Sequence, residues 1–145
     1  MSVYRVSTDA WAAQCSGRLI ATVRMPGVTT VRCIFAGLPV ADYASAYDWY
    51  VGLLGRPADM FPHDREAVWR STASAAVYVV QDPNRAGSGL LTLAVDDLDT
   101  EERRLREAGL SIAELVNEGA PRRLVVTDPD GNTLTFFQDP AEPDT

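Results

Sequence analysis

The alternation of apolar and polar residues predicts the same succession of elements at two places in the chain. In the run at 90–110, the first apolar residues alternate as in a strand with one buried face. A charged stretch with apolar residues at helical spacing follows and ends at Gly109. The run at 38–55 has the same order and ends at Gly55. Because the two runs align without a gap at an offset of 55 residues, the sequence indicates two copies of one module.

Each copy is predicted to contain a strand, a helix and three further strands. In the first copy the strands are expected at 30–40, 58–61, 67–71 and 75–81, and the helix runs from an N-cap at Asp42 to Leu54. In the second copy the strands are expected at 90–95, 111–116, 122–127 and 133–137, and the helix lies between Asp97 and Gly109. The predicted fold class is therefore α+β, with two βαβββ modules.

The repeat also sets the expected domain boundaries. Residues 1–28 match neither copy and are predicted to be an extension that the core fold does not need. Residues 29–138 form one domain, with the first module at 29–82 and the second at 90–138. The last residues, 139–145, are predicted to be an acidic, frayed tail.

Composition narrows the classes of function. The chain is 46% hydrophobic and 23% charged, with a formal net charge of −7, so it should repel nucleic acid and anionic membranes. It contains no lysine, which excludes lysine-based covalent chemistry. The sequence shows no bilayer-spanning run and no signal-peptide pattern, and the two cysteines have no metal-ligand spacing. A cytoplasmic protein is predicted.

Three segments in this order resemble the vicinal oxygen chelate superfamily, which includes glyoxalase I, extradiol dioxygenases and the bleomycin- and fosfomycin-resistance proteins. They are LPVADYASAYDWYVGLLG at 38–55, LTLAVDDLD at 91–99 and DPDGNTLTFF at 128–137. The resemblance implies two modules whose curled, mixed sheets form an open cup with the helices on its outer face, in a homodimer. It also implies a small-molecule partner, while the family's function depends on the residues that line the cup.

The resemblance places the metal ligands of metal-dependent members at four positions of this sequence. Two lie seven residues before Asp42 and Asp97, and the others lie on the last strand of each module. The residues found there are Phe35, Leu90, Tyr78 and Thr135. Phenyl and isobutyl groups cannot coordinate a cation, and the two hydroxyls are neutral. We therefore predict that the protein has no metal site and no cofactor, which counts against the metal-dependent activities of the family.

Aromatic residues are the positive signal for a binding site. Strand alternation groups Phe35 with its strand neighbours, Tyr78 with its own, Leu90 with Thr92, and Thr135 with Phe137. The predicted ligand-binding residues are Phe35, Trp69, Tyr78, Leu90, Thr92, Thr135 and Phe137. The alternative is that these side chains pack against one another and fill the cup as core.

Acidic residues before the third strand suggest the charge of the ligand. Asp59, Asp64 and Glu66 are expected at the rim of the cup, where carboxylates would suit a planar cation stacked on aromatic rings. The alternative, which fits each of these acids taken alone better, is a solvated acidic loop. His63, the only histidine, is expected on a solvated loop, and no catalytic residue is assigned.

These observations favour a metal-free binding protein of the bleomycin-resistance type. It would sequester an aromatic natural product or antibiotic, with cationic compounds favoured, and would confer resistance without transforming the ligand. One alternative is an enzyme of the same superfamily, such as a metal-independent lyase or isomerase that uses Tyr78, His63 or Glu66 as acid or base, or a metal enzyme with displaced ligands. Another is a structural homodimer in which the cup is closed.

Overall fold

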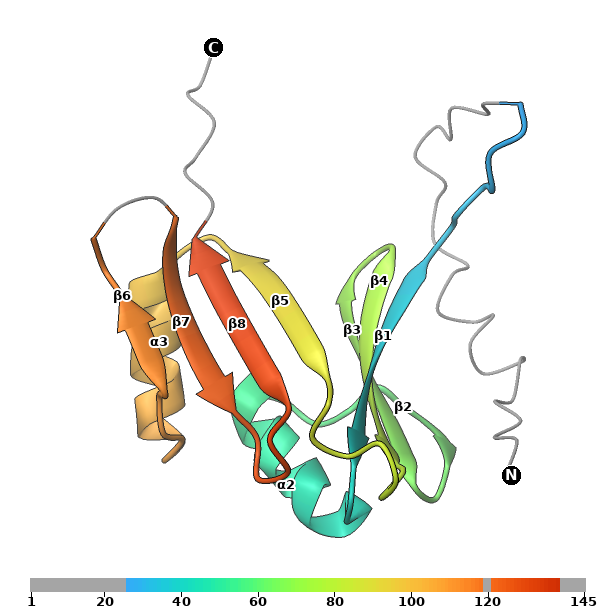
Figure 1. Ribbon diagram of the computed structural model, residues 1–145, viewed down its shortest axis with the longest axis horizontal. Helices are drawn as coiled ribbons and strands as arrows, with labels where there is room; N and C mark the ends of the chain where they lie inside the picture. The colour runs from blue at the N-terminus through green and yellow to red at the C-terminus, as the bar shows by residue number, and fades with distance from the viewer. Residues whose placement is uncertain (1–25, 119–120, 139–145) are drawn as a thin grey trace.

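Two four-stranded mixed sheets, each accompanied by one helix, form the part of the chain that the structure describes (Figure 1). This structure is a computed structural model, and it describes residues 26–118 and 121–138. The first module contains β1 (Ile34–Val40), α2 (Tyr43–Leu54), β2 (Met60–His63), β3 (Glu66–Thr72) and β4 (Ala75–Gln81). The second contains β5 (Leu90–Val95), α3 (Leu98–Glu107), β6 (Glu114–Val116), β7 (Arg122–Thr127) and β8 (Thr133–Gln138).

The two sheets have the same topology, which confirms the α+β class and the repeated module. The strand order is β1-β4-β3-β2 in one sheet and β5-β8-β7-β6 in the other. In each sheet the first strand pairs in parallel with the last strand of its module, and the remaining pairs are antiparallel. The parallel pair requires a crossover, and the helix of each module supplies part of it.

Several predicted strands begin or end elsewhere in the structure. The first strand starts at Ile34 instead of residue 30, because its partner β4 begins at Ala75 and offers no strand beyond the Ile34–Ala75 pair. The second strand is displaced to 60–63, and β6 is shorter than the predicted 111–116. β-Propensity alone does not locate these ends. The residues before Ile34 have no partner in β4, whereas Asp59 and Ala113 still donate single backbone hydrogen bonds to the carbonyls of Val68 and Val125.

The starts of the two helices differ in one detail from the prediction. Asp97 caps α3 by accepting hydrogen bonds from the backbone N–H groups of Asp99 and Thr100. Asp42 occupies the N-cap position of α2, but its carboxylate accepts a hydrogen bond from the Ser45 hydroxyl and from no backbone N–H. The left-handed Gly55 ends α2 as predicted, with its N–H bonded to the carbonyl of Val51.

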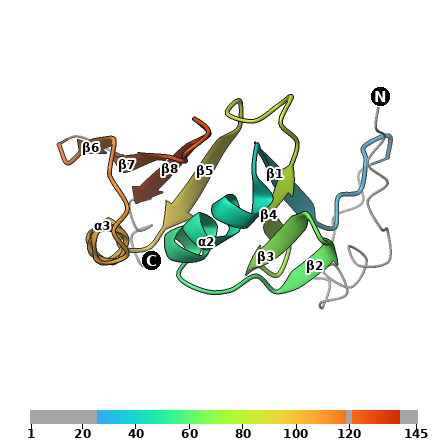
Figure 2. The same cartoon turned by 90° about the horizontal axis from the view of Figure 1, so that it is seen from below.

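One shared hydrophobic core joins the two modules. It contains the helix-facing side chains of both sheets, such as Leu38 and Val79 from the first and Leu124 and Phe136 from the second. Figure 2 shows α2 between the two sheets, with α3 at the far end of the second sheet. Neither described helix is long and apolar enough to cross a membrane.

Buried polar contacts fix the position of one module against the other. Asp128 and Asn132, from the turn between β7 and β8, are 4% and 0% exposed. Asp128 Oδ2 accepts a hydrogen bond of 2.7 Å from the Tyr50 hydroxyl on α2, and Asn132 Nδ2 donates one of 2.7 Å to the Pro39 carbonyl at the end of β1. Arg104 of α3 also donates to carbonyls in the last turn of α2. The two modules therefore pack as one unit.

Candidate functional site

The strand registers place most of the predicted ligand-binding residues on the sheet faces that turn away from the helices. We call these the outer faces. In the first sheet Gly37 pairs with Tyr78, and Phe35 lies two residues before Gly37 on the same face. In the second sheet Thr92 pairs with Thr135. The outer-face residues among the predicted set are Phe35, Tyr78, Leu90, Thr92, Thr135 and Phe137.

Trp69 lies on the opposite side of the first sheet from this set. It is 1% exposed, and its ring stacks on Tyr47 of α2 with a centroid distance of 5.7 Å. Its indole N–H donates a 2.9 Å hydrogen bond to the carbonyl of Arg56. The strand register explains this placement, because Trp69 pairs with the core residue Val77 while Val68 pairs with Tyr78. Trp69 therefore belongs to the core in this structure, although its residue type had predicted a place in the site with residues of the other face.

The Tyr78 ring has a fixed position on the outer face of the first sheet. A Cβ placed on its cross-strand partner Gly37 would lie 2.3 Å from Cζ of the Tyr78 ring. Only glycine leaves room at this position for the ring in its present pose. Burial raises the pKa of the Tyr78 hydroxyl, and the negative charge of Glu66 raises it further. Tyr78 is thus a neutral phenol beside an acidic side chain.

Glu66 and His63 form a pair beside Tyr78 that the sequence analysis did not predict. His63 ends β2 and Glu66 begins β3, and the two residues face each other across the hairpin. His63 Nε2 lies 2.9 Å from Glu66 Oε2. His63 is thus part of a strand pair and not of a solvated loop, and Glu66 is 1% exposed instead of lying at a solvated rim. The sequence held a signal for the face on which Glu66 lies, because Glu66 and Val68 alternate with the core residues of the same strand.

The other two acids of the predicted rim have different roles. Asp59 accepts hydrogen bonds from the Arg56 guanidinium and from the backbone N–H of Arg70. These contacts lower the pKa of the Asp59 carboxyl and hold it as a structural anion, even though partial burial opposes them. Asp64 is exposed in the turn between His63 and Glu66. Glu66 is therefore the acid of this group that is buried on the outer face.

The described residues contain no cluster of three or more histidine, cysteine, aspartate or glutamate side chains that could hold a metal ion. His63 and Glu66 offer two donors, and these contact each other. Phe35, Tyr78, Leu90 and Thr135 supply hydroxyl oxygens and carbon at the positions where the resemblance expected ligands. The donor set of the described outer faces therefore does not fit the chelate site of metal-dependent members.

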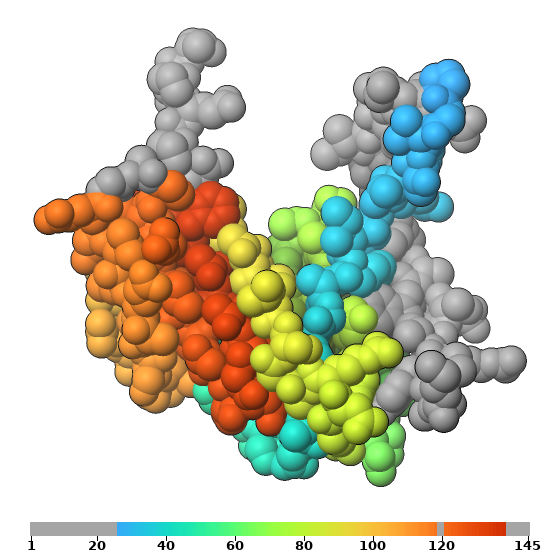
Figure 3. Space-filling model, viewed as in Figure 1, coloured from blue at the N-terminus to red at the C-terminus, as the bar shows by residue number. Residues whose placement is uncertain are grey.

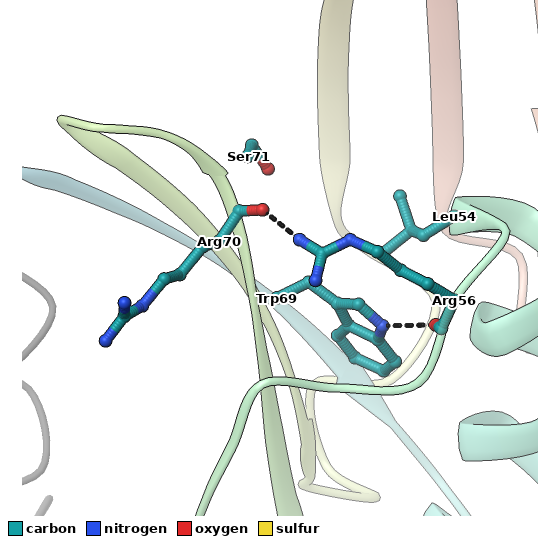
Figure 4. A pocket seen from close by; sticks show the side chains of 5 residues that line it. All are labelled: Leu54, Arg56, Trp69, Arg70 and Ser71. Atoms are coloured by element: carbon teal, nitrogen blue, oxygen red, sulfur yellow. Dashed lines mark hydrogen bonds between the residues drawn. The ribbon is translucent and has the colours of Figure 1, made fainter.

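A hollow of about 240 Å³ lies at the end of β3 near the end of α2 (Figure 4). It is lined by Leu54, Arg56, Trp69, Arg70 and Ser71. The guanidinium of Arg56 bonds to Asp59 and to the Arg70 carbonyl, while the Arg70 side chain points away from the hollow. Because its polar groups bond to one another and do not converge on a common point, this hollow is a poor candidate for the binding site.

The outer faces of the two sheets do not face one another within the chain. Both sheets pack their opposite sides on the same core, with α2 between them (Figure 2). The space-filling view shows that the sheets diverge from the base that they share (Figure 3). Several large apolar residues are exposed near the first residues of β1 and β5, including Ile34 at 62% and Leu90 at 84%. A cup with two walls is therefore not enclosed by these faces in one chain.

Paired βαβββ modules with open mixed sheets define the class of this protein as the glyoxalase and bleomycin-resistance fold. A family model described as a glyoxalase-like domain matches residues 34–137, and the chain belongs to this family.

Solved structures support the assignment. A glyoxalase/bleomycin resistance protein from Catenulispora acidiphila is 35% identical, with a TM-score of 0.72 over 74% of this chain and 98% of the other. TnmS3, an antibiotic-binding protein from Streptomyces sp. CB03234, is 27% identical, with a TM-score of 0.62 over 80% and 100% of the two chains. A bleomycin-binding protein complexed with bleomycin shares the fold at 18% identity, with a TM-score of 0.61 over 74% and 98%. No curated protein matches the sequence.

Proposed function

We propose that this protein binds an aromatic, preferably cationic natural product or antibiotic without a metal ion and without transforming it. The observation that carries the proposal is the make-up of the outer faces. Aromatic, apolar and hydroxyl side chains occupy the positions that the resemblance assigned to metal ligands. Such surfaces, with a few polar groups among them, are typical of small-molecule sites. The similarity to TnmS3, an antibiotic-binding protein, also supports a binding function.

The proposal includes a homodimer, in which each cup has one wall from each chain. The arrangement of the sheets supports this, because their outer faces turn away from the core that they share. The exposure of Leu90 and Ile34 also favours burial against a second copy. Analytical ultracentrifugation should find a dimer at micromolar concentration and a monomer for Leu90→Arg, a change that an 84% exposed side chain allows without loss of the fold. A monomeric parent protein would refute this part of the proposal.

The direct test is calorimetric titration with bleomycin, anthracyclines and aminoacridines. At least one should bind, and Phe35→Ala should weaken that binding about tenfold or more, which corresponds to about 1.4 kcal/mol. Phe61→Ala is the matched control, because Phe61 lies in the same sheet and contacts Tyr47 of α2. Equal losses in the two variants would contradict a site at Phe35, and failure to bind any of these compounds would contradict the binding function.

A metal-independent enzyme is the second candidate, and the His63–Glu66 pair is the observation that favours it. Recovery of the bound compound after incubation separates the two functions. A binding protein returns the compound with unchanged mass and chirality, whereas an enzyme returns a product and loses turnover in Glu66→Gln. Elemental analysis of the purified protein tests the metal-free state, and stoichiometric zinc, nickel, manganese or iron would refute it.

A further inference from the structure

Glu66 is a buried carboxylate with one oxygen that has no partner among the described residues. It begins β3 on the outer face, where it pairs with Val80 of β4 and with His63 of β2. Its side chain is almost fully buried, and its Oε2 atom contacts His63. Its Oε1 atom is buried and has no hydrogen-bond partner in the described part of the chain. Buried polar atoms are normally satisfied, so an acceptor in this state is open to a donor that the described residues do not supply.

His63 fixes the orientation of that carboxylate. The backbone N–H of Arg65 donates a 3.1 Å hydrogen bond to His63 Nδ1, so Nδ1 acts as an acceptor and carries no proton. In the neutral ring the proton must then be on Nε2, which lies 2.9 Å from Glu66 Oε2 and donates to it. One oxygen of Glu66 is therefore held by the protein, and the other lies buried with no donor among the described residues.

The Tyr78 ring lies close enough to Glu66 for the negative charge of Glu66 to raise the pKa of its hydroxyl. Tyr78 lies on the same face, and its ring covers Gly37 of β1. A carboxylate near an aromatic ring is suited to a flat cation, because the N–H groups of the cation can bond in plane with the carboxylate while its face meets the ring.

We propose that Glu66 Oε1 is the recognition point for a planar amidinium or guanidinium group, with His63 as the positioning residue and Tyr78 as the adjacent aromatic wall. The inference rests on the proposed binding function and names the chemical group that this function would select. Neighbouring acids are unsuited to the same role, because Asp59 is bonded to Arg56 and to the Arg70 N–H, and Asp64 is exposed.

The test uses His63 as a reporter, because it is the only histidine in the sequence. In the full chain with no histidine tag, the imidazole nitrogen signals in proton–nitrogen NMR report on this site alone. Benzamidinium is the probe, and benzamide is its neutral counterpart of the same shape. Benzamidinium should shift the His63 Nε2 signal in a saturable manner, and benzamide should bind at least tenfold more weakly. No shift with benzamidinium, or equal binding of the two compounds, would overturn the proposal.

Two variants assign the effect to Glu66. Glu66→Gln should weaken benzamidinium binding tenfold or more, while Asp64→Asn, which removes a nearby exposed carboxylate, should bind as the parent does. Equal affinity in Glu66→Gln and the parent would overturn the proposal. The comparison of benzamidinium with benzamide in the parent protein does not depend on how well a variant folds.

The outcomes separate this inference from the proposed function. If a natural product of the calorimetric panel binds the parent and Glu66→Gln equally, the binding function stands and the role of Glu66 fails. If no compound of the panel binds while benzamidinium binds in a Glu66-dependent manner, the recognition point stands and the proposed natural-product function fails.

Discussion

Removal of the Tyr50 hydroxyl should destabilise the protein, because it breaks the buried contact between the two modules. Asp128 is 4% exposed and accepts four hydrogen bonds. The Tyr50 hydroxyl and Asn132 Nδ2 donate to Oδ2 at 2.7 Å, and the backbone N–H groups of Asp130 and Asn132 donate to Oδ1 at 2.9 Å. Burial and the bond to Asp128 also raise the pKa of Tyr50 far above its usual range, so the hydroxyl keeps its proton.

The magnitude follows from the type of bond that is lost. A hydrogen bond to a charged group contributes about 1.5–3 kcal/mol. Three donors to Asp128 remain in Tyr50→Phe, and the ring keeps its packing against Trp49 at 4.9 Å, so we expect a loss of about 2 kcal/mol. Asp128→Asn should cost more, about 2–4 kcal/mol, because an amide nitrogen would then face the Asn132 Nδ2 donor.

Urea unfolding followed by tryptophan fluorescence measures this loss. With a slope of about 2 kcal/mol/M, Tyr50→Phe should lower the midpoint by about 1 M. Tyr47→Phe is the control on the same helix, because its hydroxyl has only a long 3.4 Å contact with the Ala58 N–H, and its cost should stay below about 0.5 kcal/mol. Equal midpoints for the two variants would refute the assignment of the module contact to this bond.

Three further predictions concern the outer face and its supports. Gly37→Ala should displace the Tyr78 ring, since the new Cβ would lie 2.3 Å from its Cζ, and should weaken ligand binding with a stability change of at most about 1 kcal/mol; a crystal structure with an unmoved ring would contradict this. Trp69→Phe should lower the free energy of unfolding by about 1–2 kcal/mol, because the indole hydrogen bond is lost. It should leave the ligand affinity measured by calorimetry unchanged, and weaker binding would show that Trp69 is part of the site. Burial raises the pKa of Glu66 in the folded protein above its value of about 4.3 in the unfolded chain. The protonated Glu66 side chain therefore contributes fully to the free energy of unfolding below that value, and this contribution is lost as pH rises through the folded pKa. In a His63→Gln background, the unfolding free energy relative to Glu66→Gln should therefore fall from pH 4 to pH 8, and a rise would contradict the raised pKa.

The sequence was sufficient to predict the repeat, because its signals are local. Alternation, helical spacing and the glycines that end the helices all act within a few residues. β4 and β7 match the predicted ranges 75–81 and 122–127. Strand ends were less accurate, since they depend on where a partner strand stops. Ile34 illustrates this, because the β-branched residues before it have no partner in β4.

The candidate site could be predicted only in part, because faces of strands depend on register. Alternation along their own strands predicted which neighbours share a face with Phe35, Tyr78 and Thr135, and the strand registers place all three on outer faces. Trp69 was assigned by its residue type, and the pairing of β3 with β4 puts it on the helix side. The His63–Glu66 pair joins two strands across a turn, and a contact of this kind is visible only when both strands are in place.

The structure extends the repeat from the helices to the sheets. Gln81 and Gln138 end β4 and β8, and each side-chain carbonyl accepts a hydrogen bond from the first N–H of its module's helix, that of Tyr43 or Leu98. In both modules the glutamine therefore supplies the acceptor that the first N–H of the helix lacks within the helix itself. Positions that hold the fold thus keep the same chemistry in the two copies.

Positions on the outer faces differ between the copies in a way that bears on ligand orientation. The pairing of the strands makes Glu66 and Arg123 equivalent, since they oppose Val80 and Phe137 at matching places in β4 and β8. Glu66 is buried, whereas Arg123 is exposed and forms a 3.2 Å ion pair with Glu114. In the proposed dimer, one wall of each cup would carry the buried acid and the other wall the exposed guanidinium. Because like charges repel and opposite charges attract, a ligand with a cation at one end would then enter in a single orientation, with that end at Glu66.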